Sequence, residues 1–294
     1  MSRYAGITHI TFDARGKGLS LNIWEGALLG VIQGLTEFLP VSSSGHLVIV
    51  QSFIKDFQQP GVLFDVVLHF GTLLAVLVFL RKEILDILMS LVPVGWCRNS
   101  GRGRNLVQVR AGRRMALYII TGTVVTGTIG LLFQEKIHHL FTSAIIASCM
   151  LLVTGVLLFV SDRFQGGRVE KDMNIVDSVV IGIVQGISVI PGISRSGSTI
   201  AFGIFRGLDG QTAARFSFLL SIPAIVGAVL LESQYIGIIP AGDIAVYLTG
   251  MIIAAVTGFM TLKLLLFIIR KHQLRIFAYY CWILGISTLI VKIM

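Results

Sequence analysis

Three consecutive serines and a histidine follow a carboxylate in "EFLPVSSSGHLVIV", residues 37–50, within otherwise apolar sequence. A serine hydroxyl beside an imidazole is the minimal pair for an activated nucleophile. We therefore expect Ser43 to attack an electrophilic centre and His46 to manage the proton, with Glu37 orienting the imidazole or balancing its charge. A water molecule activated by the same groups is the alternative nucleophile.

Further hydrogen-bonding groups surround this pair. Pro40 breaks the preceding helix, so Ser42 and Ser44 stand where the next short helix would start. Serine is a favoured N-cap, and the free N–H groups at a helix start bind phosphate. Capping explains one serine, but not three serines and a histidine. Gln33, four residues before Glu37, shares its helix face, and we expect Gln33, Ser42 and Ser44 to bind a phosphate.

A second polar segment, "PGISRSGST" at residues 191–199, departs from a nucleotide P-loop because Ser198 stands where that motif has lysine. Its glycines still let backbone N–H groups converge on an anion, and Arg195 supplies a planar, two-pronged donor. A guanidinium in apolar sequence needs an anionic partner, which is either Glu37 alone or a bound phosphate. In the second case Arg195 binds the phosphate and three hydroxyls assist it. These hydroxyls belong to Ser194, Ser196 and Thr199.

The sequence shows no dedicated metal site. Asp65 and His69 lie four residues apart, and we expect them to form an ordinary intramembrane pair, to support the site from outside, or to help hold a divalent ion. Mg²⁺ or Ca²⁺ could bridge a diphosphate to Glu37 or Asp65, but no cage of oxygen ligands is visible, so the expected cofactor is either none or one of these divalent cations. The cysteines are too widely spaced for a zinc site or a disulfide framework. They are Cys97, Cys149 and Cys281.

The elements that position these residues must lie in a membrane. Of the 294 residues, 54% are hydrophobic and only 13% are charged, and the mean hydropathy is +0.85. Such values exclude a soluble globular domain. Runs long enough to cross a hydrocarbon core of about 30 Å predict six spans. They cover residues 62–80, 115–133, 142–160, 214–232, 243–262 and 275–292. Without the alternation of barrel strands, the spans should be helices.

The net charge of +9 is better explained by membrane topology than by nucleic acid. Eight of the 24 Lys and Arg residues fall between Arg81 and Arg114, and others cluster in 163–171 and 263–275. The intervening loops, 134–141 and 232–242, hold only one basic residue. The positive-inside bias therefore places the basic loops in the cytoplasm and the others outside.

The chain contains an internal repeat. Residues 29–46, "LGVIQGLTEFLPVSSSGH", match residues 181–198, "IGIVQGISVIPGISRSGS", at an offset of 152. Each copy is too short and too broken to span, which predicts a re-entrant helix hairpin followed by three spans. Since three is odd, the two halves, 22–162 and 175–294, should be inverted. Their hairpins then meet near the midplane, the expected place of a buried site.

The segments "QGLTEFLPVSSSGH" and "PGISRSGST" resemble the two signatures of the undecaprenyl-diphosphatase family, the bacitracin-resistance type of membrane lipid phosphatase. The resemblance covers about residues 22–294, a single membrane-embedded domain, whereas residues 1–21 are expected to form a loosely ordered tail. Gln33 stands where many members have glutamate, which puts a role as a base in doubt at that position. The fold class expected is an all-α polytopic membrane protein, an inverted repeat of six transmembrane helices and two re-entrant hairpins.

The resemblance implies removal of the terminal phosphate of undecaprenyl diphosphate. This reaction regenerates the lipid carrier for peptidoglycan synthesis and confers bacitracin resistance. It also implies a bacterial cell membrane location, with the site facing the external side. We expect in-line attack by Ser43, with Arg195 and two helix N-termini stabilising the charge that builds on the phosphate.

The alternative function is a transporter or flippase of a polyprenyl phosphate lipid, since inverted repeats with broken helices also build carriers. The serine and histidine favour an enzyme, because a carrier of anions needs no nucleophile. The partners expected are the polyprenyl diphosphate, membrane lipids and a second copy of the chain in a homodimer, but no nucleic acid.

Overall fold

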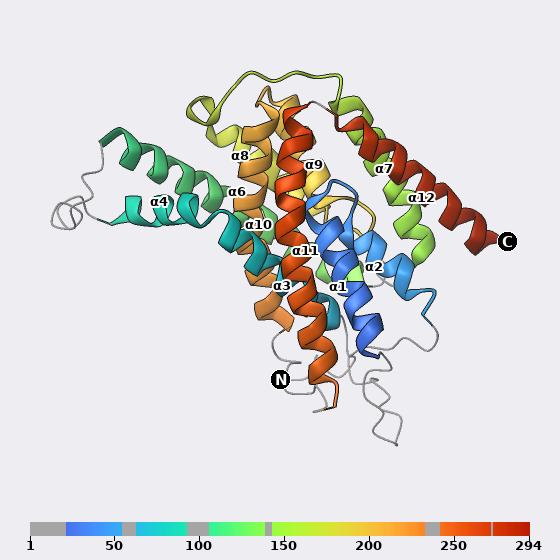
Figure 1. Cartoon of the computed structure of the whole chain (residues 1–294). Coiled ribbons are helices and arrows are strands. Elements are labelled where there is room, and N and C mark those ends of the chain that lie inside the picture. Colours follow the sequence, from blue (N-terminus) through green and yellow to red (C-terminus); the bar gives the residue numbers. More distant parts are fainter. Residues whose placement is uncertain (1–21, 55–62, 93–105, 139–142, 233–241, 272) are drawn as a thin grey trace, which may run out of the picture.

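The computed structural model describes residues 22–54, 63–92, 106–138, 143–232, 242–271 and 273–294 (Figure 1). The predicted tail, residues 1–21, and Cys97 lie outside them. The described residues form α-helices, one 3₁₀ turn (η2, Glu170–Asp172) and a single isolated bridge between Arg168 and Leu208, so the all-α prediction is confirmed. The helices of the first half are α1 (Ile23–Phe38), α2 (Ser43–Gln51), α3 (Leu63–Phe79), α4 (Arg81–Leu91), α6 (Leu106–His138) and α7 (Ala144–Ser161). Those of the second half are α8 (Ile175–Ile187), α9 (Arg195–Phe205), α10 (Gly210–Glu232), α11 (Ile244–Arg270) and α12 (Arg275–Ile293).

Five described helices are long and apolar enough to cross a membrane, namely α6, α7, α10, α11 and α12. The number rises to six if α3 and α4, which meet at a bend of 75°, are counted as one span. The six apolar runs of the sequence coincide with α3 and these five helices. The chain is therefore a multi-pass membrane protein.

The sequence did not predict α4 or the first turns of α6. Its basic residues suggested a loop, but α4 and the start of α6 lie side by side in an arm that projects from the bundle (Figure 1). The two helices touch closely, since Arg113 Nε donates to the Ser90 carbonyl at 2.8 Å. Apolar side chains at Leu85 and Leu88 are exposed along the arm. The charged residues of this segment lie between apolar ones at helical spacing, so the helices are amphipathic. A search for long apolar runs therefore did not detect them.

Each polar segment forms a broken helix pair. The first hairpin, α1 and α2, turns at residues 39–42, and the second hairpin, α8 and α9, turns at residues 188–194. Both turns need left-handed backbone: φ is +69° at Ser42 and +94° at Gly192. A proline follows the first helix of each pair, and a serine N-cap, Ser42 or Ser194, begins the second. The sequence predicted the proline break and the serine cap of the first hairpin.

The packing of the hairpins follows the internal repeat. α1 packs on α11, where a Cβ added to Gly30 would lie 2.5 Å from the Gly250 carbonyl oxygen. Its repeat partner Gly182 makes the same kind of crossing between α8 and α6, 2.8 Å from the Gly122 carbonyl oxygen. α6 and α11 hold equivalent places in the two halves. The crossing of α1 with α11 is therefore equivalent to the crossing of α8 with α6. The opposite membrane orientation of the halves stays a prediction.

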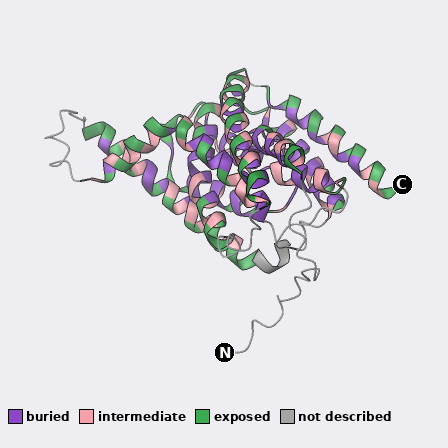
Figure 2. Ribbon diagram, turned by 60° about the horizontal axis from the view of Figure 1, so that its bottom comes forward, coloured by how far each residue is buried: buried purple, intermediate pink, exposed green. Residues whose placement is uncertain are grey.

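The turns of the two hairpins contact each other at the centre of the molecule, where buried residues concentrate (Figure 2). A Cβ added to Gly45 would lie 2.9 Å from Gly192 Cα, and one added to Gly197 would lie 3.1 Å from Pro40 Cβ. Each hairpin therefore packs the start of its second helix against the turn of the other. This reciprocal contact brings the two polar segments together.

An ion cluster closes the open end of the second hairpin. The fully buried Asp177 accepts hydrogen bonds from Arg168 at 2.7 Å and from Arg206 at 2.9 Å, and from the Asn174 N–H at 2.9 Å. Burial alone would raise the pKa of Asp177, but these hydrogen bonds outweigh it and hold that pKa below its ordinary value. The cluster ties the start of α8 to the end of α9.

Candidate active site

Glu37 lies at the centre of the polar contacts between the hairpins. It is 5% exposed, and its Oε2 accepts hydrogen bonds from Ser43 Oγ at 2.6 Å and from Gln33 Nε2 at 2.9 Å. Its Oε1 pairs with Arg195 Nη2 of the second hairpin. His69 Nε2, on α3, lies 3.4 Å from Oε2. The Glu37 carboxylate thus contacts both hairpins and the neighbouring helix α3. Its hydrogen bonds and ion pair offset the free-energy cost of burying the charge.

Ser43 is the first residue of α2. Ser42 caps that helix, since its Oγ accepts from the Gly45 N–H at 3.2 Å, and lies 3.4 Å from Ser44 Oγ. The capping geometry leaves Ser43 half-buried with its hydroxyl on Glu37. The nucleophile expected from the sequence is therefore positioned at a helix N-terminus, where developing negative charge is favoured.

Arg195 is the first residue of α9, and Ser194 caps that helix by accepting from the Gly197 N–H at 3.0 Å. Arg195 Nη2 is taken by Glu37, but Nη1 is buried and has no partner among the described residues. A buried guanidinium nitrogen without an acceptor is costly unless a ligand supplies one. Glu37 thus pairs with one side of the guanidinium and leaves the other available for an anion. Binding of a phosphate by Arg195 stays a prediction.

His46 does not make the contact expected with Glu37. Its Nδ1 lies 2.7 Å from the Ser42 carbonyl oxygen and its Nε2 lies 2.7 Å from Tyr280 Oη, with the two rings nearly parallel. Since a carbonyl only accepts, Nδ1 carries a proton, and in the neutral ring Nε2 accepts from the tyrosine. Through its hydrogen bond to the Ser42 carbonyl, the His46 ring stabilises the turn that precedes Ser43.

The histidine that touches Glu37 is His69. Its Nδ1 donates to the Asp65 carbonyl oxygen at 2.7 Å, which directs Nε2 towards Glu37. The Asp65 carboxylate instead accepts from Gln51 Nε2 at 2.6 Å. The four-residue spacing of Asp65 and His69 was the available signal, but it did not reveal that the histidine faces another helix.

The hydroxyls of Ser196 and Thr199 in the second hairpin bond to protein groups. Ser196 Oγ donates to the Leu39 carbonyl at 3.0 Å, across the hairpin contact. Thr199 Oγ1 donates to the Arg195 carbonyl at 2.8 Å and lies 2.6 Å from Ser217 Oγ. Ser196 and Thr199 therefore stabilise the site rather than line it.

A cavity of about 490 Å³ opens beside these groups. Its polar end, which we name the head site, contains eight of the residues discussed. They are Glu37, Ser42, Ser43, Ser44, Asp65, His69, Ser194 and Arg195. Beyond them the cavity runs between α3, α6 and α10 along mainly apolar side chains. Such a space fits a ligand with an anionic head and an apolar tail. Gln33 and His46 do not line it.

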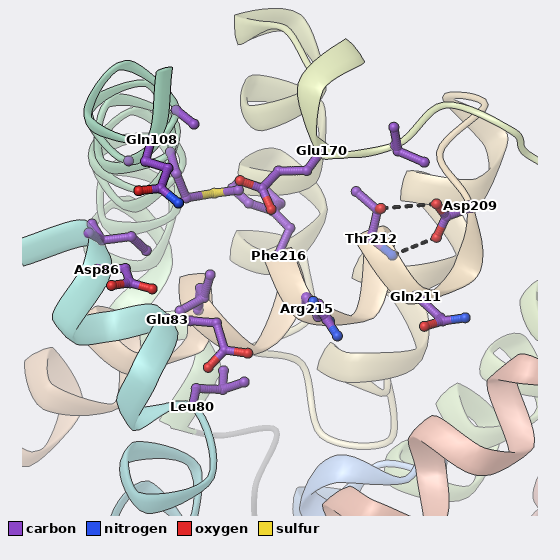
Figure 3. A pocket seen from close by; sticks show the side chains of 16 residues that line it. Leu80, Glu83, Asp86, Gln108, Glu170, Asp209, Gln211, Thr212, Arg215 and Phe216 are labelled. Atoms are coloured by element: carbon purple, nitrogen blue, oxygen red, sulfur yellow. Dashed lines mark hydrogen bonds between the residues drawn. The ribbon is translucent and has the colours of Figure 1, made fainter. Parts of the chain in front are cut away.

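A second cavity, of about 500 Å³, lies between α4, α6 and α10 and holds none of the expected site residues (Figure 3). Arg215 shares it with acidic side chains, among them Glu83 and Glu170. Asp209, on its wall, caps α10 by accepting from the Thr212 N–H at 2.7 Å. The chemistry of the first cavity makes it the candidate active site.

The described residues contain no group of three or more His, Cys, Asp or Glu side chains arranged to hold a metal ion. Glu37 and Asp65, the ligands considered from the sequence, are hydrogen-bonded to protein groups instead. The donor set therefore does not fit a preformed divalent-cation cage.

Comparisons with known proteins show the family of the chain. The family model described as "Bacitracin resistance protein BacA" matches residues 26–287. An undecaprenyl-diphosphatase of Desulfosudis oleivorans is 47% identical over 270 residues, which are 90% of this chain and 97% of the relative. One of Methanosphaera stadtmanae is 41% identical over 277 residues, 93% of this chain and 99% of the relative. One of Desulforapulum autotrophicum is 42% identical over 274 residues, 92% and 98% respectively.

Proposed function

Because this chain belongs to the BacA family of bacitracin resistance proteins, we infer that it is a phosphatase that hydrolyses undecaprenyl diphosphate to undecaprenyl phosphate and inorganic phosphate. The reaction recycles the lipid carrier for cell-wall synthesis. One observation carries this inference to the site: Ser43 donates to Glu37 while Arg195 pairs with the same carboxylate and keeps a buried donor free at the cavity.

In the proposed mechanism, the diphosphate lies in the head site with its terminal phosphoryl group between Ser43 and Arg195. Ser43 Oγ forms a bond to the terminal phosphorus while its proton passes to Glu37, which already accepts it. The bond from that phosphorus to the bridging oxygen breaks, and undecaprenyl phosphate leaves with the bonding electrons. Arg195 Nη1 and the starts of α2 and α9 stabilise the charge on the equatorial oxygens.

The second step is attack by water on the phosphoserine. Glu37 returns its proton to Ser43 Oγ as the phosphorus–Oγ bond breaks, and the protons of the water leave with inorganic phosphate. His46 acts as a positioning residue in this scheme, because it holds the Ser42 carbonyl and faces away from the cavity. Gln33, Ser196 and Thr199 likewise position the site, while Ser42, Ser44 and Ser194 face the phosphate.

The test of function is phosphate release from undecaprenyl diphosphate by the purified protein in detergent, compared with Ser43→Ala. The wild type should release phosphate, and the variant should lose about 10²–10³-fold in rate or more. When the terminal phosphate of the substrate is radiolabelled, a radioactive phosphoprotein should be trapped in the wild type but not in the variant. Release by Ser43→Ala at a normal rate would make water the nucleophile. No release by the wild type, together with lipid movement in vesicles, would favour the flippase alternative instead.

We also propose that the protein lies in the bacterial inner membrane, with hydrolysis on its external side. The ends of the elements support this topology. Leu274 N donates to Asp162 at one end of the bundle, where basic residues gather, and Lys292 Nζ donates to the Ser52 carbonyl where the first hairpin opens. The positive-inside bias makes the first end cytoplasmic. A homodimer stays a prediction from the sequence.

A further inference from the structure

Three glycines leave the apolar part of the catalytic cavity without side chains along two of its walls. Gly127 and Gly130 belong to α6 and Gly227 belongs to α10, and all three line the cavity. A Cβ added to any of them would meet no other atom within 4 Å. Backbone alone therefore forms the wall at these positions, and we name them the glycine slot.

Helix packing does not account for these glycines. On the same helix, Gly122 is a packing glycine, because its added Cβ would lie 2.8 Å from Leu220 Cδ1. The slot glycines have no such neighbour. Apart from proline, glycine is the least favourable residue inside a helix. Three glycines that face open space thus weaken α6 and α10 and return no contact within the protein. What they provide is room in the cavity.

A buried polar side chain with an unpaired atom borders the same cavity. Gln185 lines the cavity and is 2% exposed, yet its Oε1 has no partner among the described residues. The amide cannot be turned round, because its Nε2 faces two acceptors, the Leu220 carbonyl at 3.3 Å and Thr126 Oγ1 at 3.4 Å. The unpaired oxygen requires a donor. A prenyl chain carries none, so Gln185 marks a polar point of the cavity wall and not the path of the lipid tail.

We propose that the glycine slot admits the first isoprene units of the lipid tail and so determines specificity for prenyl diphosphates; this rests on the proposed function. A prenyl chain carries a methyl branch on every unit and is broader than an unbranched acyl chain. It must leave the head site along an apolar surface. The cavity supplies that surface through Val189, Ile193 and Val229, and the slot supplies width where a side chain would remove it.

The experiment fills the slot with a side chain that the fold tolerates. Gly127→Leu and Gly227→Leu project into open space and improve helix propensity, so both variants should fold. Thr128→Leu on α6 and Val226→Leu on α10 are matched controls, because these exposed neighbours do not line the cavity. The slot variants should raise KM for undecaprenyl diphosphate at least about tenfold, and the controls less than about twofold. Farnesyl diphosphate carries the same first isoprene units, so its KM should rise by a similar factor.

Binding to the Ser43→Ala protein separates this proposal from the proposed function. Calorimetric titration with undecaprenyl diphosphate should show weaker binding when Gly127→Leu or Gly227→Leu is added to that variant. If the wild type releases no phosphate but the slot variants still bind more weakly, the activity is wrong and the slot stands. If KM and affinity do not change in the slot variants, or change equally in the controls, the slot is overturned.

Discussion

At the scale of single residues, the site depends on how many partners Glu37 serves at once. It accepts the Ser43 hydroxyl, balances Arg195 and receives Gln33, all from a position that is almost fully buried. Because Arg195 is held by this carboxylate, its free nitrogen has a fixed direction before substrate arrives. Preorganised donors of this kind lower the barrier without a reorganisation cost.

Replacing Glu37 tests this dependence. Glu37→Gln keeps the shape but removes the charge, so Ser43 loses its proton acceptor and Arg195 is left unpaired. We expect the rate of phosphate release to fall about 10²–10³-fold. Breaking a buried ion pair should also lower the free energy of unfolding by about 3–5 kcal/mol. Phosphate release and thermal unfolding in detergent measure both, with Glu25→Gln on the same helix as the control. Unchanged turnover would exclude Glu37 from the reaction.

Tyr280→Phe tests the positioning role of His46. The change removes the hydroxyl that faces His46 Nε2 but leaves the hydrogen bond from Nδ1 to the Ser42 carbonyl. We expect a loss of about 1 kcal/mol in stability and less than about threefold in kcat. Steady-state kinetics and thermal unfolding check this. A hundredfold fall in kcat at unchanged stability would instead mean that His46 takes part in proton transfer.

The sequence predicted that Ser43, Glu37 and Arg195 would lie close together. Their motifs sit at helix breaks, where the residue types indicate the chemistry without knowledge of the fold. It paired Glu37 with the wrong histidine neighbour. His46 is closer along the chain, but the helix start turns its ring towards Tyr280, more than two hundred residues away. His69 meets Glu37 only because α3 packs beside α1. Such approaches between helices are not encoded in local spacing.

At the scale of elements, helix crossings at glycine carry the arrangement of the hairpins. Gly30→Ala and Gly182→Ala would each push a Cβ into a backbone carbonyl of the facing helix. We expect each to lower stability by about 1–3 kcal/mol through overpacking. Gly227→Ala, which meets open space, should instead be neutral or stabilise by up to about 1 kcal/mol. Thermal unfolding of the three variants decides this, and equal effects at all three positions would contradict it.

The ion cluster at the second hairpin predicts a pH dependence. Since the pKa of Asp177 is lowered by folding, its contribution to stability is complete above its ordinary value of about 3.8 and is lost as the pH falls through the lower folded value. Asp177→Asn should therefore melt lower than the wild type at neutral pH, and the gap should close on acidification below about pH 4.

Melting curves in detergent across this range measure the difference between the two proteins, which cancels the other carboxyl groups. Glu170→Gln, an exposed change in the nearby 3₁₀ turn, is the control and should follow the wild type at every pH. A gap between Asp177→Asn and the wild type that widens in acid would contradict the cluster's role.

The sequence predicted the spans and both hairpin breaks, because hydropathy and proline act locally. It did not predict the arm of α4 and the start of α6. In this segment the basic residues, which indicate the cytoplasmic side, also interrupt the apolar pattern from which a helix would be predicted. α3 and α4 meet at a bend of 75°, and α4 packs against α6, which comes from a later part of the chain.

At the scale of the whole molecule, the two halves should lie in opposite senses across the membrane. Ser52→Cys and Lys171→Cys, made in a protein without native cysteines, place one thiol at the open end of each hairpin. A membrane-impermeant maleimide added to intact spheroplasts should label the first variant and leave the second unlabelled until the membrane is opened. Labelling of both from one side would rule out the inverted arrangement and the meeting of hairpins from opposite faces.

The reciprocal contact of the turns has a consequence for how such a protein can change over time. Gly45 lies against Gly192, and Gly197 lies against Pro40, so each turn is packed directly against the other hairpin. A mutation that enlarges one turn displaces the other, and a compensating mutation must arise in the opposite half of the gene. The two copies of the duplicated segment therefore constrain each other's evolution at this junction.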